Sequence, residues 1–155
     1  MRTLTALIFS IVLLTKTATA QSVSIDNRAT GKQLTADLTA AITKVNDYWQ
    51  SHHSPKCRAF WDHAAYFTAN QKVYERTHKK EYLDYALAWA EYNHWKGATQ
   101  TDKRQWQYKT YGEGMNHVLF ADWQICFQVY IDLYKQEHRA ERLQRTLEVM
   151  CYQAS

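Results

Sequence analysis

The sequence predicts an all-α fold built from paired helices, on the basis of three observations. Apolar residues recur at helical spacing in several segments, which is typical of amphipathic helices. Glycine and proline together supply only five of the 155 residues, which leaves few positions for tight turns between strands. The chain also repeats itself at an offset of 60 residues. We therefore expect helices and no substantial sheet.

The first predicted helix covers residues 34–51. Its apolar side chains share one face at helical spacing: Leu34, Leu38, Ile42, Val45 and Trp49. Pro55 and the polar residues around it end this helix.

Two helix pairs follow, and the predicted helices cover residues 62–77 with 80–94, then 121–137 with 139–152. Between the pairs lies a polar, aromatic-rich stretch over residues 95–117. It is long for a loop, and long loops in compact domains are more often functional than idle.

The two pairs are copies of one another. Nine of the 33 positions are identical when residues 60–92 are set against residues 120–152, and Asp62 then aligns with Asp122. Each copy is a helix, a tight connection and a second helix, which is the αα-hairpin unit. Stacked hairpins form an open superhelix or a closed α/α toroid. The variable aromatic loop between the copies favours αα-hairpin repeats arranged as a partial toroid.

Both connections carry the pattern His-x-x-Glu, at residues 78–81 and 138–141. We expect each Glu to meet free backbone N–H groups in the first turn of the following helix. A His/Glu metal site is the less favoured alternative. The histidines form no HExxH motif and the cysteines no CxxC spacing, so no metal and no cofactor are expected.

The N-terminus resembles an export signal. Arg2 precedes an apolar run over residues 4–14, and the small residues at 18–20 suit cleavage before Gln21. The run is too short to span a bilayer as a stop-transfer helix. We predict a periplasmic or secreted protein with a signal peptide over 1–20, a linker over 21–33 and a helical domain over 34–155. No membrane partner is expected after the signal is removed.

The net charge and the cysteine content limit the partners and the disulfides that we expect for this chain. Loss of Arg2 and Lys16 with the signal lowers the net charge from +4 to +2, and Glu is interleaved in the densest basic stretches. A nucleic-acid partner is therefore not expected.

Three cysteines allow at most one disulfide within the chain. Cys126, in an apolar stretch, is expected to be a buried free thiol.

Four sequence stretches, by their order and spacing, allow a comparison with known protein families. They read FWDHAAY at 60–66, EYLDYALAWAE at 81–91, NHWKG at 93–97, and FADWQICFQ at 120–128 leading into YIDLY at 130–134. Together they resemble consecutive landmarks of glycoside hydrolase families 88 and 105, the unsaturated glycuronyl (rhamnogalacturonyl) hydrolases. The likeness covers roughly residues 45–155.

This resemblance implies an (α/α)6 toroid with a pocket at one end of its inner helices. Members remove a terminal 4,5-unsaturated uronic acid from oligosaccharides that polysaccharide lyases produce, so the implied partner is an unsaturated uronyl oligosaccharide. An Asp protonates C4, water adds at C5, and the resulting hemiketal opens to release the neighbouring sugar. One acid/base group and a water suffice for this hydration. The alternatives are a non-catalytic helical-repeat module that binds a glycan or a protein, and a degenerate remnant.

The resemblance implies that Asp122 is the first of two catalytic aspartates. The second would follow the motif seen at residues 150–153, so we expect an incomplete toroid, the N-terminal portion of the enzyme, that is inactive alone. The residues themselves leave an alternative role for Asp122: it begins a predicted helix, where it could be an N-cap that accepts backbone N–H bonds, as Asp62 could in the other copy.

Four residues near Asp122 are candidate substrate-binding residues because indole rings can stack on sugars and polar side chains can bond hydroxyls: Trp61, His63, Trp123 and Gln124. Core packing is the favoured alternative for Trp123, and an ordinary surface position is the alternative for His63. Aromatic residues that flank the long loop are expected to form one wall of the pocket: Trp95, Trp106, Tyr108 and Tyr111.

Overall fold

The computed structural model describes residues 27–155, and it contains helices, turns and loops but no strand in that part of the chain. The elements are α1 (Asn27–His52), α2 (Trp61–Thr77), α3 (Lys80–Tyr92), η1 (Lys103–Gln105), α4 (Ala121–Gln124), α5 (Cys126–Gln136), η2 (Ala140–Arg142) and α6 (Gln144–Ala154). All five predicted helices are present, which confirms the all-α prediction. The predicted signal peptide lies outside the described residues.

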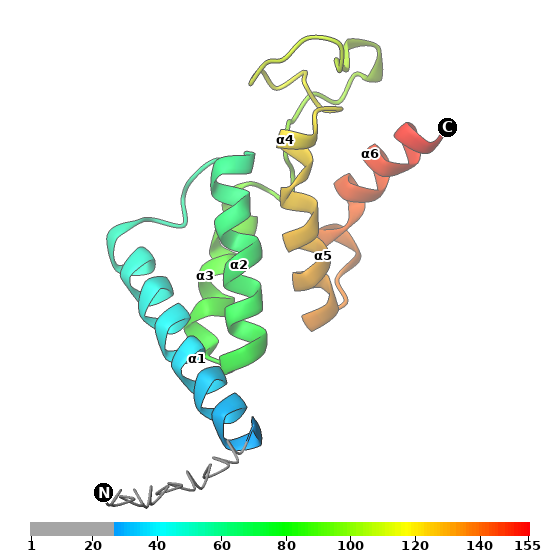
Figure 1. Cartoon of the computed structure of the whole chain (residues 1–155). Helices are drawn as coiled ribbons and strands as arrows, with labels where there is room; N and C mark the ends of the chain where they lie inside the picture. Colours follow the sequence, from blue (N-terminus) through cyan, green and yellow to red (C-terminus); the bar gives the residue numbers. More distant parts are fainter. Residues whose placement is uncertain (1–26) are drawn as a thin grey trace, which may run out of the picture.

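The helices run alternately up and down in Figure 1. α2 packs against α1, α3 and α5, so it lies at the centre of the arrangement. α2 and the consecutive pair α4–α5 run in the same direction, whereas α1, α3 and α6 run the opposite way. The N-terminal ends of α2 and α4 therefore lie at the same end of the molecule. The loop between α3 and α4 lies beyond that end.

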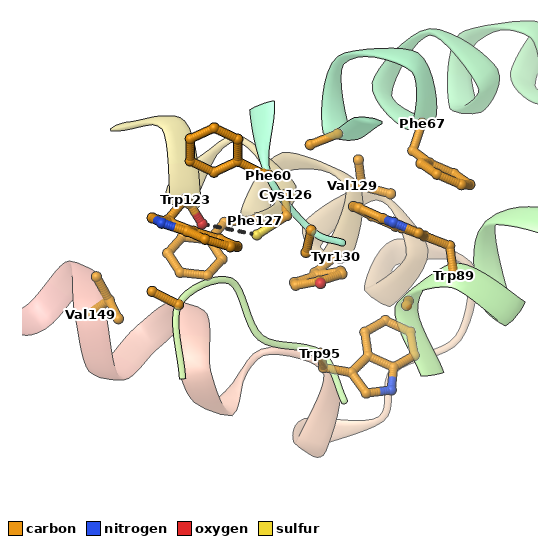
Figure 2. Packing of buried hydrophobic residues seen from close by; sticks show 14 of the residues in the cluster. Phe60, Phe67, Trp89, Trp95, Trp123, Cys126, Phe127, Val129, Tyr130 and Val149 are labelled. Carbon is orange, nitrogen blue, oxygen red and sulfur yellow. Dashed lines mark hydrogen bonds between the residues drawn. The ribbon is translucent and has the colours of Figure 1, made fainter. Parts of the chain in front are cut away.

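The core at the junction of α2, α3 and α5 is aromatic (Figure 2). The ring of Phe67 stacks on Trp89 with centroids 4.2 Å apart, and Trp89 meets Tyr130 at 5.7 Å. Burial of each ring stabilises the fold by about 1.5–3 kcal/mol. Cys126 is fully buried beside them as a free thiol that donates to the Trp123 carbonyl at 3.2 Å, which confirms the prediction for this cysteine.

α1 packs on α2 through polar side chains. The Nδ2 group of buried Asn46 donates to Asn70 Oδ1 at 2.9 Å, and the Tyr66 hydroxyl donates to Asn46 Oδ1 at 2.7 Å. An amphipathic helix ordinarily turns its apolar stripe toward the core. Here four of the five stripe residues are solvent-exposed, with exposed fractions between 41% and 69% for Leu34, Leu38, Ile42 and Val45. The fifth, Trp49, is half-buried and stacks on the Tyr66 ring with centroids 4.6 Å apart. α1 also begins at Asn27, before the predicted start at residue 34.

The first hairpin connection does not use the predicted glutamate cap. His78 ends α2 in the left-handed conformation, at φ 54° and ψ 23°, and its N–H donates to the Tyr74 carbonyl at 2.7 Å. Lys79 is the N-cap of α3 and has no side-chain capping bond. Glu81 is the second residue of α3, and its carboxylate pairs with the Lys79 ammonium at 3.9 Å. Because it does not bond the backbone N–H groups of the first turn, the capping prediction is wrong for this residue.

The second connection differs because a buried arginine folds back over it. The Arg142 guanidinium donates to the carbonyls of Leu133 and Glu137 at 3.1 and 3.2 Å, and these carbonyls lie at the end of α5. Residues 140–142 form a 3-10 turn that brings Arg142 into this position. α6 consequently begins at Gln144 and not at residue 139, and Glu141 does not cap it.

The exit from α3 is strained and tightly packed. His94 and Trp95 both have left-handed φ angles, 52° and 57°, and the Trp95 N–H donates to the Ala90 carbonyl at 2.9 Å. Two residues later the chain passes directly against α4. A Cβ atom on Gly97 would lie 2.0 Å from the Trp123 carbonyl oxygen, so only glycine fits. This contact positions the start of α4, where the candidate catalytic residue lies.

Candidate active site

The candidate site lies at the shared N-terminal end of α2 and α4. Phe60 and Phe120 are the N-cap residues of the two helices, and the Phe60 ring meets the Trp123 ring edge-on at 4.7 Å. Asp62 and Asp122 lie in the first turns of these helices. Unpaired N–H groups and the positive end of the helix dipole favour a carboxylate there. The repeat thus brings the two aspartates to the same end of the helix layer.

Asp122 is not a helix cap. The N-cap position belongs to Phe120, which makes no side-chain capping bond, and the Asp122 carboxylate makes no hydrogen bond or ion pair with any residue of the described part of the chain. The N-cap alternative is therefore wrong. Its half-buried carboxylate remains available for a ligand.

A charged network holds the other aspartate. The Arg58 guanidinium lies between Asp62, at 2.8 Å, and the carboxylate of Glu113, which it also bonds. Asp62 accepts further bonds from the His63 N–H at 2.9 Å and contacts His63 Nδ1 at 3.1 Å. Burial tends to raise the pKa of Asp62, but the bonds from Arg58 and His63 outweigh it and lower the pKa. The bond from Arg58 likewise lowers the pKa of Glu113.

The tip of the long loop joins this network. The Tyr111 hydroxyl donates to Glu113 Oε1 at 3.2 Å, and its ring lies edge-on to Phe120 with centroids 6.2 Å apart. Partial desolvation raises the pKa of Tyr111, and the bond to Glu113 and the charges of Glu113 and Asp122 raise it further. The phenol is therefore protonated at neutral pH and can act as a hydrogen-bond donor.

The structure separates the four predicted substrate-binding residues. Trp61 is exposed and His63 is half-buried at the site. Gln124 is half-buried, and its amide donates to the Val118 carbonyl at 3.0 Å, which ties the end of the loop to α4. Trp123 is only 3% exposed and belongs to the core, which is the alternative that the sequence favours for it.

The aromatic wall predicted from the loop is only partly present. Trp95 and Trp106 are largely buried in the core, each beneath the guanidinium of a buried arginine, although Trp106 also lines a cavity. Tyr108 and Tyr111 are exposed. An open cavity of about 290 Å³ is lined by residues 106–110, in the same loop.

Arg58 and Glu113 were not predicted as site residues. Arg58 stands four residues before Asp62 but precedes the start of α2, so helical spacing does not predict this ion pair. Glu113 is 55 residues away from Arg58 in the sequence, and no local pattern links the two.

Two further structural observations concern the described residues alone. Within residues 27–155, no three His, Cys, Asp or Glu side chains lie close enough together to share a metal ion. None of the helices in that range combines the length and hydrophobicity that crossing a bilayer requires.

Comparison with known proteins gives three matches. Residues 35–155 match the family described as Glycosyl Hydrolase Family 88. A solved structure described as a glycosyl hydrolase family 88 protein from Bacteroides vulgatus is 48% identical over 77% of this chain, with a TM-score of 0.75. Another, described as a polysaccharide lyase, is 50% identical over 77% of this chain, with a TM-score of 0.74. The chain covers 34% of each of those chains, about a third of their length. No curated protein matches it.

Proposed function

Because the chain belongs to glycosyl hydrolase family 88, we propose that it forms the N-terminal part of an unsaturated glycuronyl hydrolase. The substrate is an oligosaccharide that ends in a 4,5-unsaturated uronic acid, such as a polysaccharide lyase releases. Asp122 is the catalytic carboxylate of this part of the enzyme. The remaining wall of the pocket comes from the part of the fold that this chain does not span.

One observation carries the proposal. Asp122 is a half-buried carboxylate at a helix N-terminus with no hydrogen bond or ion pair inside the described structure, whereas Asp62, its partner in the repeat, is fully engaged by Arg58 and His63. A carboxylate with only a structural role at a helix start would bond backbone N–H groups. The free carboxylate of Asp122 supports a role toward a ligand.

The proposed chemistry needs few groups. In the proposed step the Asp122 carboxyl group gives a proton to C4 of the unsaturated ring, and a water oxygen adds to C5 while the proton of that water is taken up by a base. The product is a hemiketal, which opens and breaks the bond to the neighbouring sugar. Trp61, exposed at the same end, offers a flat surface for a sugar ring, and the half-buried His63 ring can bond a hydroxyl group.

The second similar structure supports an alternative function, a polysaccharide lyase, since it is described as one and is 50% identical to this chain. A lyase performs the reverse change at the double bond. A base removes the proton from C5, the bond between C4 and the glycosidic oxygen breaks, the leaving oxygen takes up a proton, and a C4–C5 double bond forms. The two functions therefore change the ultraviolet absorbance of that bond in opposite directions.

Protein expressed from the complete gene distinguishes these functions. With an unsaturated uronyl disaccharide, the hydrolase proposal predicts a steady loss of the double-bond absorbance. A rise in that absorbance on an intact uronate-bearing polysaccharide, with no loss on the disaccharide, would establish the lyase function instead. No change with either substrate would favour a non-catalytic glycan- or protein-binding module.

We also propose that residues 1–20 direct export to the periplasm or the medium. The support is the basic residue, the apolar run and the small residues of the sequence itself. N-terminal sequencing of the exported protein should begin at Gln21. An unprocessed N-terminus in the cytoplasmic fraction would contradict export.

A further inference from the structure

A continuous series of polar contacts connects the long loop to the start of α2. It begins at the Tyr111 hydroxyl, which donates to Glu113 at 3.2 Å, and Glu113 in turn accepts from Arg58. Arg58 continues to Asp62 at 2.8 Å, and Asp62 contacts His63. Residues 106–117 are thereby attached to a rigid helix end through a charged pair.

The loop is also held from within. The Gln107 N–H donates to the Asn116 carbonyl at 2.9 Å, so the tip between them is closed at its base. Gly112 lies against the His117 imidazole, and a Cβ atom there would lie 2.3 Å from that ring. Because the base of the tip is fixed, the Arg58–Glu113 pair determines which way the tip points.

The position of the tip matters for the candidate site. The Tyr111 ring packs against Phe120, two residues before Asp122, and the charge of Asp122 acts on the Tyr111 phenol. Tyr111 nevertheless remains 66% exposed. Because the Tyr111 hydroxyl gives its proton to Glu113, its exposed oxygen can still accept a hydrogen bond from a hydroxyl group of a sugar.

We propose that the Arg58–Glu113 pair is a latch that holds the tip of the loop over the helix ends, and that the latched Tyr111 hydroxyl binds the uronyl residue of the substrate. Glu113 and Arg58 are positioning residues, because they act through Tyr111. The role of Tyr111 rests on the proposed function. The latch itself rests on the geometry alone.

Limited proteolysis tests the latch without any substrate. Trypsin cleaves after Lys109, two residues before Tyr111, and mass spectrometry can follow that cleavage. Glu113→Gln removes the charge but keeps the shape, and it should accelerate cleavage at this site severalfold. Glu75→Gln is the matched control, since Glu75 is as exposed as Glu113, at 44% against 46%, and pairs with Lys72 far along α2. Equal cleavage rates for Glu113→Gln and wild-type protein would overturn the latch.

Kinetics of the protein from the complete gene test the role of Tyr111. Tyr111→Phe should raise KM for the unsaturated disaccharide by roughly three- to tenfold, as expected for one lost neutral hydrogen bond, with kcat and Tm close to wild type. Glu113→Gln should raise KM in the same way, and Glu113→Asp should recover part of the loss. Tyr48→Phe on α1, where Tyr48 is 64% exposed, is the control.

The outcomes separate this inference from the proposed function. An active, Asp122-dependent enzyme whose KM is unchanged in Tyr111→Phe would overturn the binding role while leaving the function intact. A protein with neither hydrolase nor lyase activity would overturn the function and the binding role together, and the proteolysis result would then decide the latch by itself.

Discussion

At the scale of single residues, Gly97 is the position where the structure allows least change. Its Cα faces the Trp123 carbonyl so closely that a Cβ atom would lie 2.0 Å away from a backbone oxygen, which cannot rotate aside. We expect Gly97→Ala to lower the free energy of unfolding by about 1–3 kcal/mol. Gly31→Ala in α1 has nothing within 4 Å and should raise it by about 0.5–1 kcal/mol. Urea unfolding measures both, and a Gly97→Ala protein as stable as wild type would contradict this packing.

The pH dependence of the melting temperature tests the ion pair between Glu113 and Arg58. Its pKa is lowered chiefly by the bond from Arg58, so the folded carboxylate holds its proton less tightly than the unfolded one. Its stabilising contribution is therefore complete above the unfolded pKa of about 4.3 and is lost as the pH falls through the lower, folded pKa. Wild-type protein should have a higher Tm than Glu113→Gln at pH 7, and the gap should narrow as the pH falls below the unfolded pKa. A gap that does not narrow on acidification would contradict the ion pair.

At the scale of elements, the contact between α1 and α2 depends on buried amides. Asn70 is fully buried, accepts bonds from Asn46 and Gln50 at 2.9 Å each, and donates to the Tyr82 carbonyl at 2.8 Å. Asn70→Ala removes these three bonds and leaves the buried Asn46 amide N–H group without its acceptor, whereas Gln50 keeps its bond to the Tyr66 hydroxyl. We therefore expect a loss of about 1–3 kcal/mol in the free energy of unfolding. Amide hydrogen exchange should rise most in α1.

The control for Asn70→Ala is Gln33→Ala, which removes an exposed amide on α1 whose bond is to Asp37 at 2.8 Å. That change should be nearly neutral. If both variants lost the same stability, the buried amide network would not be what holds α1 to α2.

The helices themselves were predictable from the sequence because their signals are local. The apolar period and the repeat place α2 within one residue of its predicted start and bring Asp62 and Asp122 to one end. The start of α6 was not predictable, since it depends on Arg142 reaching back to carbonyls of α5. The exposed stripe of α1 was not predictable either, since periodicity gives a helix its faces but does not say which face packs.

The same difference between local and long-range signals applies to the candidate site. Asp122 and the exposed Trp61 are site candidates because of their place in the repeat and the family resemblance, and their roles stay predictions. The Arg58–Glu113 pair joins residues 55 positions apart in the sequence. It depends on how the loop packs on the helix ends, which no local sequence pattern predicts. Trp123 shows the converse, because a site residue expected from its position is buried against Phe60.

At the scale of the whole molecule, α1 and α6 lie at the two ends of the row of helices (Figure 1). Both helices carry exposed apolar side chains. Leu147 and Met150 on α6 are 56% and 42% exposed, and the α1 stripe contains Leu38. Such surfaces ordinarily pack against other protein. We therefore expect the 155-residue chain to self-associate at micromolar concentration, as measured by light scattering after gel filtration.

The substitutions Leu38→Gln and Leu147→Gln should reduce this association without lowering Tm, because both side chains are already exposed. Leu133→Gln is the contrasting variant, since Leu133 is fully buried and the change should unfold the protein. A wild-type chain that stays monomeric at all concentrations would show that these surfaces need no cover.

The central claim is that Asp122 is the catalytic carboxylate of an unsaturated glycuronyl hydrolase. The most direct test measures how fast Asp122→Asn protein from the complete gene turns over an unsaturated uronyl disaccharide, and it measures Tm for the same protein. Asp122 makes no hydrogen bond or ion pair in the described structure, so Tm should not change, whereas turnover should fall by about 10²–10⁴-fold. Asp84→Asn, at an exposed carboxylate paired with Lys80 on α3, should retain wild-type turnover. Full turnover by Asp122→Asn, or a loss that only accompanies a fall in Tm, would contradict the account.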